Sequence, residues 1–564
     1  MRWPSMVCSL VACGAFAFID ACGISNEAAP GDDAHPADAE ASDDGWVRGP
    51  DGPAADGAPG PTLEDGGKDA HAALDGGMDA DAHADAGDPP PPPPGPLAPG
   101  YVDYEVNHIL ETGQSNSVAS GARPQNTFTA GTAFTSAQPY TNLMFDTGVM
   151  TAGPKPGVAE GVNCNGSGCP ATSYRAPTMF VPLIENDSFF GGGDRVETAS
   201  SSMANEISSL AISRLMFGVK AGYPAKHDLL VSLHGRSGNT YWCLRKGGCN
   251  YKPASEIPAF EEAVKQVEAG KALAAAAGKS YIVRAVTTDH GESDHYGYQD
   301  GGSEFPLPGT NGVANRVKDY DDALIEWQED YEAMVQGITG QVQPVPLFVS
   351  GLSGWTGTQP AHRTSKLAAL QLTAHERAPG KVILVAPGYI FDPAIQSNGQ
   401  LECLHYSLLG QQHLGEYFAK AYVRTVLEGK PFEPVRPLAV QRVANVITVK
   451  FHVPVPPLVI DTVRVNAAGI SSYGFDFLDN GALAMITSVV ITAADTVTIT
   501  LAATPSAGDK RLRYALNQPI PGCIGPGVLT SGGARGNLRD SDPTPSLKGF
   551  TLFNWSVAFD VAVP

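Results

Sequence analysis

Five strand-like runs separated by helical stretches constrain the fold of this chain more than any other feature. Short, largely apolar runs occur at 106–110, 229–233, 281–286, 345–349 and 382–385. Amphipathic patterns with helical periodicity lie between them, at 257–277, 320–338 and 365–376. Strands that alternate with helices of this length predict βαβ units and a mostly parallel sheet covered by helices on both faces.

Two regions depart from this pattern. Residues 118–225 are rich in Thr, Ser, Gly and Pro, which predicts a long insertion of substrate-shaping loops after the first strand. After Gly429, short β-rich runs separated by Gly, Pro, Asn and Asp predict an antiparallel sandwich, with strands at 446–453, 458–465, 489–491 and 497–501. We therefore expect an α/β domain over 101–433 and an accessory β-sandwich over 434–564. Within the latter, residues 539–542 (Arg-Asp-Ser-Asp) are predicted to form a solvated loop or a calcium-type turn.

The first 22 residues have the pattern of an export signal. Arg2 precedes a small, apolar run at 6–19 that is too short to span a bilayer as a mature helix. The run ends in Ile-Asp-Ala-Cys, which resembles the site where bacterial lipoproteins are cleaved and acylated, here on Cys22. Cys13 matches that pattern better by letters but leaves too little apolar length before it. We expect an exported protein with a lipid anchor at Cys22, and ordinary secretion is the alternative.

Residues 23–100 carry most of the acidity of the chain. They contain 17 Asp and Glu against 2 Lys and Arg, a net charge of −15 out of −22, which leaves −7 for the other residues. This Ala-, Asp-, Gly- and Pro-rich stretch has too few large apolar residues to offset its ordering entropy, so we expect a disordered spacer. The remainder has no basic face that would neutralise phosphates, which makes nucleic acid an improbable partner.

Six cysteines lie beyond the signal and spacer. In an exported chain, Cys164 with Cys169 and Cys243 with Cys249 are close enough in sequence to close small disulfide loops. Cys403 and Cys523 would have to join distant segments, and we do not predict that pair. No cysteine spacing fits a zinc site, so we expect no metal.

The candidate chemistry lies where the predicted strands end. The first strand runs into residues 111–117 (Glu-Thr-Gly-Gln-Ser-Asn-Ser), which predict a tight turn into a helix with the Ser115 hydroxyl above the sheet. The second and third strands run into residues 232–240 and 289–294. After the fifth strand, Glu402 precedes His405 by three residues, and a carboxylate there can orient the imidazole as a general base.

These motifs together resemble the SGNH/GDSL hydrolases, and more narrowly the sialate O-acetylesterase-like branch that includes carbohydrate acetyl esterases. The resemblance rests on Gly-Gln-Ser-Asn at 113–116, Gly238, Gly-Glu-Ser-Asp at 291–294, and Glu402 with His405. It implies a flavodoxin-like α/β sandwich, a Ser115 nucleophile and a His405 base, with no cofactor. The oxyanion donors would be the backbone N–H groups of Ser115 and Gly238 and the side chain of His290. The expected supporting residues are Gln114, Asn116, Gly291, Glu292 and Asp294.

Two residues differ from the usual family pattern. Glu402 stands where aspartate is usual, so Asp392 is a possible substitute for it, and His290 stands where many members have glutamine. The leading hypothesis is an exported serine esterase that removes acetyl groups from carbohydrate. The alternatives are a weakly active or inactive surface carbohydrate-binding protein and an esterase acting on lipids or simple esters. Tyr241 and Trp242 could line a sugar-binding cleft or belong to the core, and the sequence favours neither.

Overall fold

The computed structural model describes most of the chain after residue 95. The described ranges are 96–122, 132–152, 174–185, 196–248, 257–299, 305–357, 365–396, 399–516, 530–533 and 535–564, and all of them fall within one compact unit. The expected export signal, Cys22 and the spacer up to residue 95 lie outside the described residues. So do Cys164, Cys169, Cys249 and Cys523.

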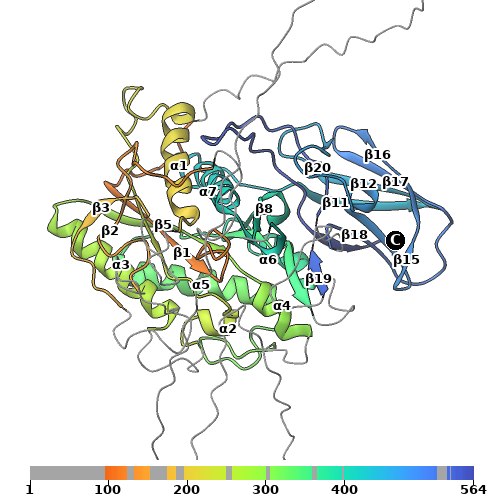
Figure 1. The fold of residues 1–564 in the computed structure, drawn as a ribbon, viewed down its shortest axis with the longest axis horizontal. Helices are drawn as coiled ribbons and strands as arrows, with labels where there is room; N and C mark the ends of the chain where they lie inside the picture. The colour runs from red at the N-terminus through yellow and green to blue at the C-terminus, as the bar shows by residue number, and fades with distance from the viewer. Residues whose placement is uncertain are drawn as a thin grey trace, which may run out of the picture. The chain divides into compact units, whose positions relative to one another are not determined.

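A seven-stranded sheet forms the centre of the first part (Figure 1). All five predicted strands are present and parallel, as β1 (Val106–Gly113), β4 (Leu229–Leu233), β5 (Tyr281–Asp289), β6 (Leu347–Gly351) and β8 (Val382–Pro387). Their side chains are buried almost throughout, which is why they read as continuous apolar runs rather than as an alternating pattern. The mostly parallel α/β sheet is therefore confirmed.

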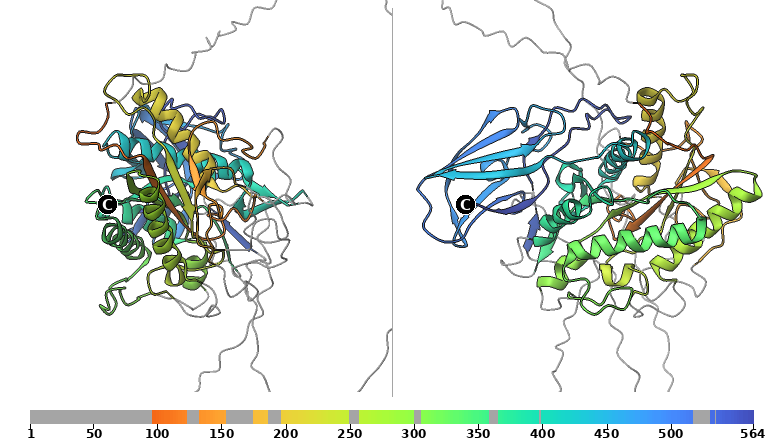
Figure 2. Two further views of the ribbon diagram at one scale, coloured as in Figure 1. Left: turned by 90° about the vertical axis from the view of Figure 1, so that its left-hand side faces the viewer. Right: turned by 180° about the vertical axis from the view of Figure 1, so that it is seen from behind.

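Helices cover both faces of this sheet (Figure 2). The three predicted helices pack on one face with a shared apolar core, as α3 (Ala259–Ala276), α5 (Tyr320–Thr339) and α6 (Lys366–Arg377). The other face is covered by α1 (Ala199–Leu215) and α7 (Leu408–Tyr422), which continues as a short π-helical turn, Val423–Leu427. Local caps define several ends: Asp319 accepts a hydrogen bond from Tyr320 N at the start of α5, and Gly340 ends it with a φ of 77°.

The region expected to be a loop insertion is more regular than predicted. It supplies β2 (Leu143–Phe145), β3 (Phe180–Pro182) and the 17-residue helix α1. The sequence did not predict helix α1, because its buried face consists largely of serine and alanine. The Ser200 hydroxyl bonds Glu111, and Ser201 Oγ donates to Glu185 Oε1 at 2.7 Å, so buried carboxylates satisfy polar side chains where apolar periodicity was sought.

Antiparallel sheets make up the C-terminal part, as expected. One contains, in spatial order, β11 (Arg436–Val443), β12 (Val446–His452), β17 (Thr496–Leu501) and β16 (Ile486–Ala493). The other contains β15 (Ala482–Ala484), β14 (Phe475–Asp479), β18 (Lys510–Tyr514) and β21 (Phe559–Ala562). The strand predicted at 458–465 is reduced to β13 (Val459–Ile460), which pairs with β20 (Leu538–Arg539). Apolar side chains from both sheets belong to the same core as those of α5 and α6.

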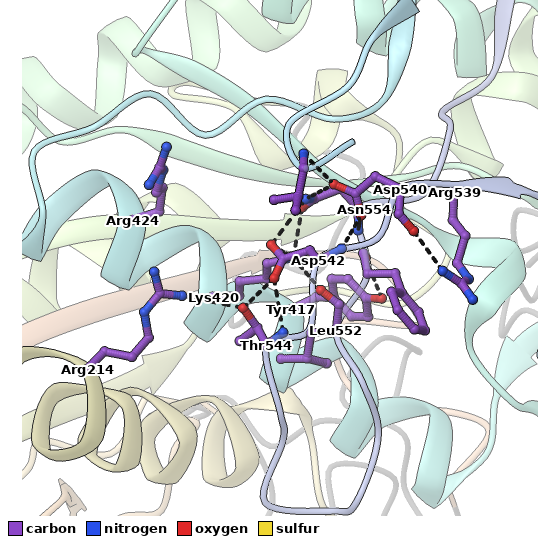
Figure 3. Close-up of polar contacts among 12 residues, drawn as sticks. Arg214, Tyr417, Lys420, Arg424, Arg539, Asp540, Asp542, Thr544, Leu552 and Asn554 are labelled. Carbon is purple, nitrogen blue, oxygen red and sulfur yellow. Dashed lines mark hydrogen bonds and ion pairs between the residues drawn. The ribbon is translucent and has the colours of Figure 1, made fainter. Parts of the chain in front are cut away.

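The Arg-Asp-Ser-Asp segment is not a solvated loop, which corrects the prediction (Figure 3). Asp540 is fully buried and Asp542 is 8% exposed. The cation beside them is the ammonium of Lys420 from α7, which lies 3.0 Å from Asp542 Oδ2, donates to Asn554 Oδ1 at 2.8 Å and also bonds the carbonyl of Leu552.

The charges around Asp542 favour its ion pair with Lys420. Burial alone would raise the pKa of Asp542, but Lys420 and the bonds from Thr544 outweigh it and lower that pKa to about 2. Asp540 accepts hydrogen bonds from Val455 N, Asp542 N and both nitrogens of Asn554. The segment 540–554 therefore fastens the C-terminal part to α7 through buried, fully bonded charges.

Replacing Lys420 should destabilise the whole protein. Lys420→Met leaves Asp542 as an uncompensated buried charge, which costs about 3–5 kcal/mol. Lys450→Met is the matched control, because the Lys450 side chain is 60% exposed and pairs with Asp495 on the surface, where a salt bridge is worth about 1 kcal/mol or less. Urea unfolding of both variants measures the difference. Equal stability of the two variants would contradict the structural role of Lys420.

Buried glutamates between α1 and α7 should make stability depend on pH. Burial and the neighbouring Glu416 raise the pKa of Glu206 to about 8, and burial raises that of Glu416 to about 7. A carboxyl with a raised folded pKa retains its proton when the unfolded chain has lost it, so stability falls as pH rises. Below pH 6.5 this effect is opposed by buried histidines with lowered pKa values, such as His234 (about 4).

The free energy of unfolding should therefore decrease between pH 6.5 and 8.5. Glu206→Gln should reduce this decrease by roughly 1–2 kcal/mol, because the glutamine has no proton to lose. Urea unfolding of the wild type and this variant at the two pH values is the measurement. A wild-type protein that is more stable at pH 8.5 than at 6.5 would contradict the prediction.

Candidate active site

The turn after β1 presents Ser115 at the carboxyl edge of the central sheet. Gly113 ends the strand with a φ of 123°, and a Cβ there would lie 2.3 Å from Ser117 Oγ and 2.4 Å from Asp289 O, so only glycine fits. The expected α-helix does not follow. Residues 115–121 form successive hydrogen-bonded turns instead, in which Ser120 N donates to Ser115 O at 2.9 Å.

A two-stranded hairpin after β8 carries the histidine. It consists of β9 (Pro393–Ile395) and β10 (Leu401–Tyr406), and within β10 the imidazole Nδ1 of His405 bonds Oε1 of Glu402. His405 Nε2 is buried and has no hydrogen-bond partner among the described residues. The Glu402 carboxylate can only accept a hydrogen bond, so it keeps the ring proton on Nδ1 and leaves the lone pair on Nε2, which is the arrangement a general base requires.

Asn116 joins the serine turn to the histidine strand. Its Nδ2 donates to Leu404 O at 3.1 Å, and its Oδ1 accepts from Tyr406 N at 3.2 Å. These bonds hold the residues on either side of His405 to the residue next to Ser115. The packing is close, because a Cβ added to Gly121 of the same turn would lie 2.7 Å from His405 Cβ. Segments almost 300 positions apart in sequence therefore meet at one edge of the sheet.

Asp392 does not substitute for Glu402. Its Oδ2 pairs with Arg464 Nη2 at 2.9 Å, and the same guanidinium donates to Ile390 O at 2.8 Å and to His413 Nδ1 at 3.0 Å. Glu402 is the carboxylate on the imidazole of His405. Of the two candidate carboxylates, Glu402 contacts the imidazole and Asp392 contacts Arg464.

Residues 289–294 after β5, here called the third loop, support the serine turn, residues 113–121; the second loop is residues 234–240 after β4. Gln114 Oε1 accepts from Ser293 N at 3.1 Å, and Glu292 Oε1 accepts from Asn116 Nδ2 at 2.9 Å. Glu292 and Ser293 begin α4 (Glu292–Gln299), which directly follows Gly291. Glu292 is buried, and this burial, followed by the charge of Asp289, raises the pKa of its carboxyl to about 8.

The second loop packs against the same turn through Gly235 and Arg236. Arg236 N donates to Gly113 O at 2.9 Å, and a Cβ on Gly235 would lie 2.9 Å from that oxygen. Gly238 follows with a φ of 69°. Asp294 of the third loop accepts from Tyr241 N at 3.0 and 3.2 Å, which ties the second and third loops together.

His290 has protein partners on both ring nitrogens. Nδ1 lies 2.8 Å from Tyr320 Oη, and Nε2 lies 3.2 Å from Asn239 O and 3.3 Å from Asp294 Oδ2. The ring is almost fully buried, and burial lowers its pKa to about 4, so it is neutral. Because both ring nitrogens face protein partners, His290 holds the second and third loops together rather than presenting an N–H to the expected oxyanion.

Aromatic residues beside Gly238 are mainly structural. Tyr241 belongs to α2 (Tyr241–Leu244), is fully buried and donates its hydroxyl to Glu326 Oε1 at 2.6 Å, which makes it a core residue. Trp242 is half-buried under the guanidinium of Arg245, which lies 4.2 Å from its ring centroid. Cys243 is disulfide-bonded. Its expected partner, Cys249, lies outside the described residues.

The C-terminal part also reaches this edge of the sheet. β7 (Gly354–Gly357), which follows the site-facing end of β6, pairs antiparallel with β19 (Thr530–Gly533). Trp355 of β7 is fully buried, and its ring centroid lies 5.7 Å from that of His295 in α4. A strand more than 100 residues beyond β10 therefore supports the third loop, which sequence patterns did not predict.

Fold and site together define a class: an α/β protein with a serine-bearing turn and a histidine–carboxylate pair at the carboxyl edge of a mostly parallel sheet. Within the described ranges, no group of three or more His, Cys, Asp or Glu side chains is arranged to hold a metal ion. None of the helices described is long and apolar enough to cross a membrane.

Comparisons with known proteins leave the family of this chain open. No family model and no curated protein matches it. A carbohydrate acetylesterase from Xanthomonas citri is similar in structure, with a TM-score of 0.44, 11% identity, and coverage of 81% of this chain and 80% of its own. A carbohydrate acetylesterase from Sinorhizobium meliloti has a TM-score of 0.25 and 11% identity, covering 56% of this chain and 97% of its own. An aryl esterase from M. smegmatis has a TM-score of 0.25 and 11% identity, covering 57% of this chain and 100% of its own. At this level of similarity these structures carry no argument about activity.

Removing the charge of Glu402 should abolish most turnover of an ester substrate. Glu402→Gln cannot stabilise a protonated His405, so kcat should fall about 10³–10⁴-fold with little change in KM. Asp392→Asn is the matched control, because its carboxylate pairs with Arg464 rather than with the imidazole. It should lower stability and leave kcat within about threefold. Steady-state kinetics on an aryl acetate measures both, and the reverse order of effects would assign the orienting role to Asp392.

Proposed function

We propose that this protein is an exported serine esterase that removes acetyl groups from carbohydrate. The proposal includes a flavodoxin-like SGNH-type fold over 101–433, an accessory β-sandwich over 434–564 and lipid attachment at Cys22. The observation that carries it is the pair of Asn116 hydrogen bonds that hold the strand of His405 against the turn of Ser115, together with the contact of Glu402 with Nδ1 of the imidazole. This arrangement supplies a nucleophile, a base and an orienting acid without a cofactor.

The reaction would proceed by acyl transfer. Ser115 Oγ attacks the ester carbonyl while His405 Nε2 takes the hydroxyl proton, and Glu402 stabilises the resulting imidazolium. The carbonyl oxygen becomes an oxyanion, which the backbone N–H groups of Ser115 and Gly238 would receive as hydrogen-bond donors. Losing one such donor typically costs about 2.7–4 kcal/mol of barrier. The tetrahedral intermediate collapses, and His405 returns the proton to the departing sugar hydroxyl.

Water completes the cycle. It attacks the acetyl-Ser115 ester as His405 accepts one of its protons, and collapse of the second intermediate releases acetate and restores the serine hydroxyl. Most of the site is buried, with Ser115 and His405 4% and 6% exposed. The low dielectric strengthens the contact between Glu402 and the imidazolium.

The substrate class rests on the resemblance of the two motifs at 113–116 and 291–294 to those of sialate O-acetylesterase-like enzymes. The expected export signal and spacer suit an extracellular glycan that is too large to enter the cell. The alternative is a surface carbohydrate-binding protein with weak or no turnover, since Glu402 and His290 both differ from the usual family pattern.

Purified full-length protein should release acetate from an aryl acetate and from acetylated sugars, and Ser115→Ala should abolish both activities. The alanine variant lacks the attacking oxygen but retains the bonds of Asn116, so it should keep the wild-type melting temperature. Acetate release from a panel of acetylated mono- and polysaccharides identifies the substrate. Wild-type activity no higher than that of the alanine variant would favour the carbohydrate-binding alternative.

A further inference from the structure

The serine turn is a single helical turn closed by a Schellman motif. Ser120 N donates to Ser115 O at 2.9 Å. Nested inside this bond, Ala119 N donates to Asn116 O at 3.1 Å. This pair of bonds is the pattern with which a helix ends on a residue in the left-handed conformation, and that residue is Ala119, with a φ of 56°. The carbonyl of Ser115 is therefore itself part of the motif.

Alanine is an unfavourable residue at the left-handed position of this motif. Glycine usually occupies it, because a Cβ opposes a positive φ. If residues 115–121 continued as a regular α-helix, Ser120 N would bond Asn116 O, four residues back, and Ala119 would be relieved of its left-handed conformation. A contact from outside the turn is therefore needed to explain why the chain keeps the observed form.

The side chain of Gln411 makes such a contact. Its Nε2 donates to Asn116 O at 2.8 Å, so the carbonyl that an α-helix would offer to Ser120 N is engaged by a donor from α7. Gln411 is fully buried, and its Oε1 has no hydrogen-bond partner among the described residues. Burying an amide with one polar atom unsatisfied is costly, and the bond to the serine turn accounts for a polar side chain at this position.

Gln411 is itself fixed by the segment that carries the histidine. It lies in the first turn of α7, where its N–H donates to Ser407 O at 2.9 Å. Ser407 caps this helix by accepting from Gly410 N, and its own N–H donates to Asp392 O at 2.8 Å. The amide of Gln411 therefore ties the serine turn to the helix that begins directly after the strand of His405.

We propose that Gln411 is a positioning residue for Ser115, which it holds in the Schellman turn by bonding the backbone of Asn116. This inference rests on the proposed esterase function. The side chain of Asn116 bonds the residues on both sides of His405, and its carbonyl bonds Gln411. One continuous segment, 404–411, thus holds the residue next to the nucleophile by its side chain and by its backbone.

The first test compares Gln411→Met with Gln412→Met in the full-length protein. Methionine suits a helix and keeps the length of the side chain, but it has no N–H to donate. Gln411→Met should lower kcat on an aryl acetate by roughly 10²-fold with little change in KM, because a displacement of the nucleophile by about 1 Å has an effect of that size.

Gln412 is the matched control because it is buried in the same turn of the same helix. Its Nε2 donates to Ala133 O at 3.0 Å and to Glu197 Oε1 at 2.9 Å, and neither partner belongs to the serine turn. Gln412→Met should therefore lower stability and leave kcat near the wild-type value. An equal loss of kcat in the two variants would overturn the proposal.

A second substitution separates positioning from stability. Ala119→Gly removes the Cβ that opposes the left-handed conformation, so in the Gln411→Met background it should recover roughly tenfold of the lost kcat. In the wild type the turn is already held, and the same substitution should not raise kcat. Urea unfolding of every variant defines conditions in which each is fully folded, and kinetics are measured there. Absence of recovery in the double variant would overturn the proposal.

Amide hydrogen exchange gives a readout that needs no turnover. In Gln411→Met the N–H groups of Ala119 and Ser120 should exchange faster than in the wild type, because opening of the turn no longer breaks a bond to α7. Gln412→Met should leave their exchange unchanged. Unchanged exchange or an unchanged kcat in Gln411→Met would contradict the role of Gln411. If the wild type shows no Ser115-dependent hydrolysis, the proposed function fails, and the exchange still decides whether Gln411 holds the turn.

Discussion

The hydrogen bonds of the Asn116 side chain are the interaction on which the rest of this site depends. One amide group joins the turn after the first parallel strand to the backbone on both sides of His405 and to Glu292 of the third loop. Each bond is modest by itself, worth on the order of 1 kcal/mol in net stability. Together they set the relative positions of three segments that are far apart in sequence, and the proposed acyl transfer depends on such positioning.

Much of the fold could be predicted because its central strands and three of its helices obey simple periodicities. Helices α3, α5 and α6 lie within a few residues of their predicted limits, since their apolar faces and flanking caps are visible in the sequence. Helix α1 could not be predicted, because its buried serines are satisfied by Glu111 and Glu185, and a partner distant in sequence leaves no local pattern. The pairing of β7 with β19 likewise joins distant segments, and neither segment has a local sequence pattern that predicts it.

The candidate site was predictable in outline and not in detail. Sequence spacing placed Glu402 near His405, and the two side chains are in contact within β10, where the register with β9 shifts between Leu401 and Tyr406. Spacing could not show that Asp392 forms an ion pair with Arg464, or that His290 forms hydrogen bonds with Tyr320 and Asn239. These partners come from other elements of the fold.

The ammonium of Lys420 has a consequence for the order in which the molecule can form. Helix α7 directly follows the strand that carries His405, yet Leu552, which bonds Lys420, is synthesised 132 residues later. Until that segment emerges from the ribosome, α7 carries a positive charge on a side that must become interior, and its packing against the sheet is penalised. Assembly of the edge that carries His405 is thereby deferred until the C-terminal segment around Leu552 has been synthesised.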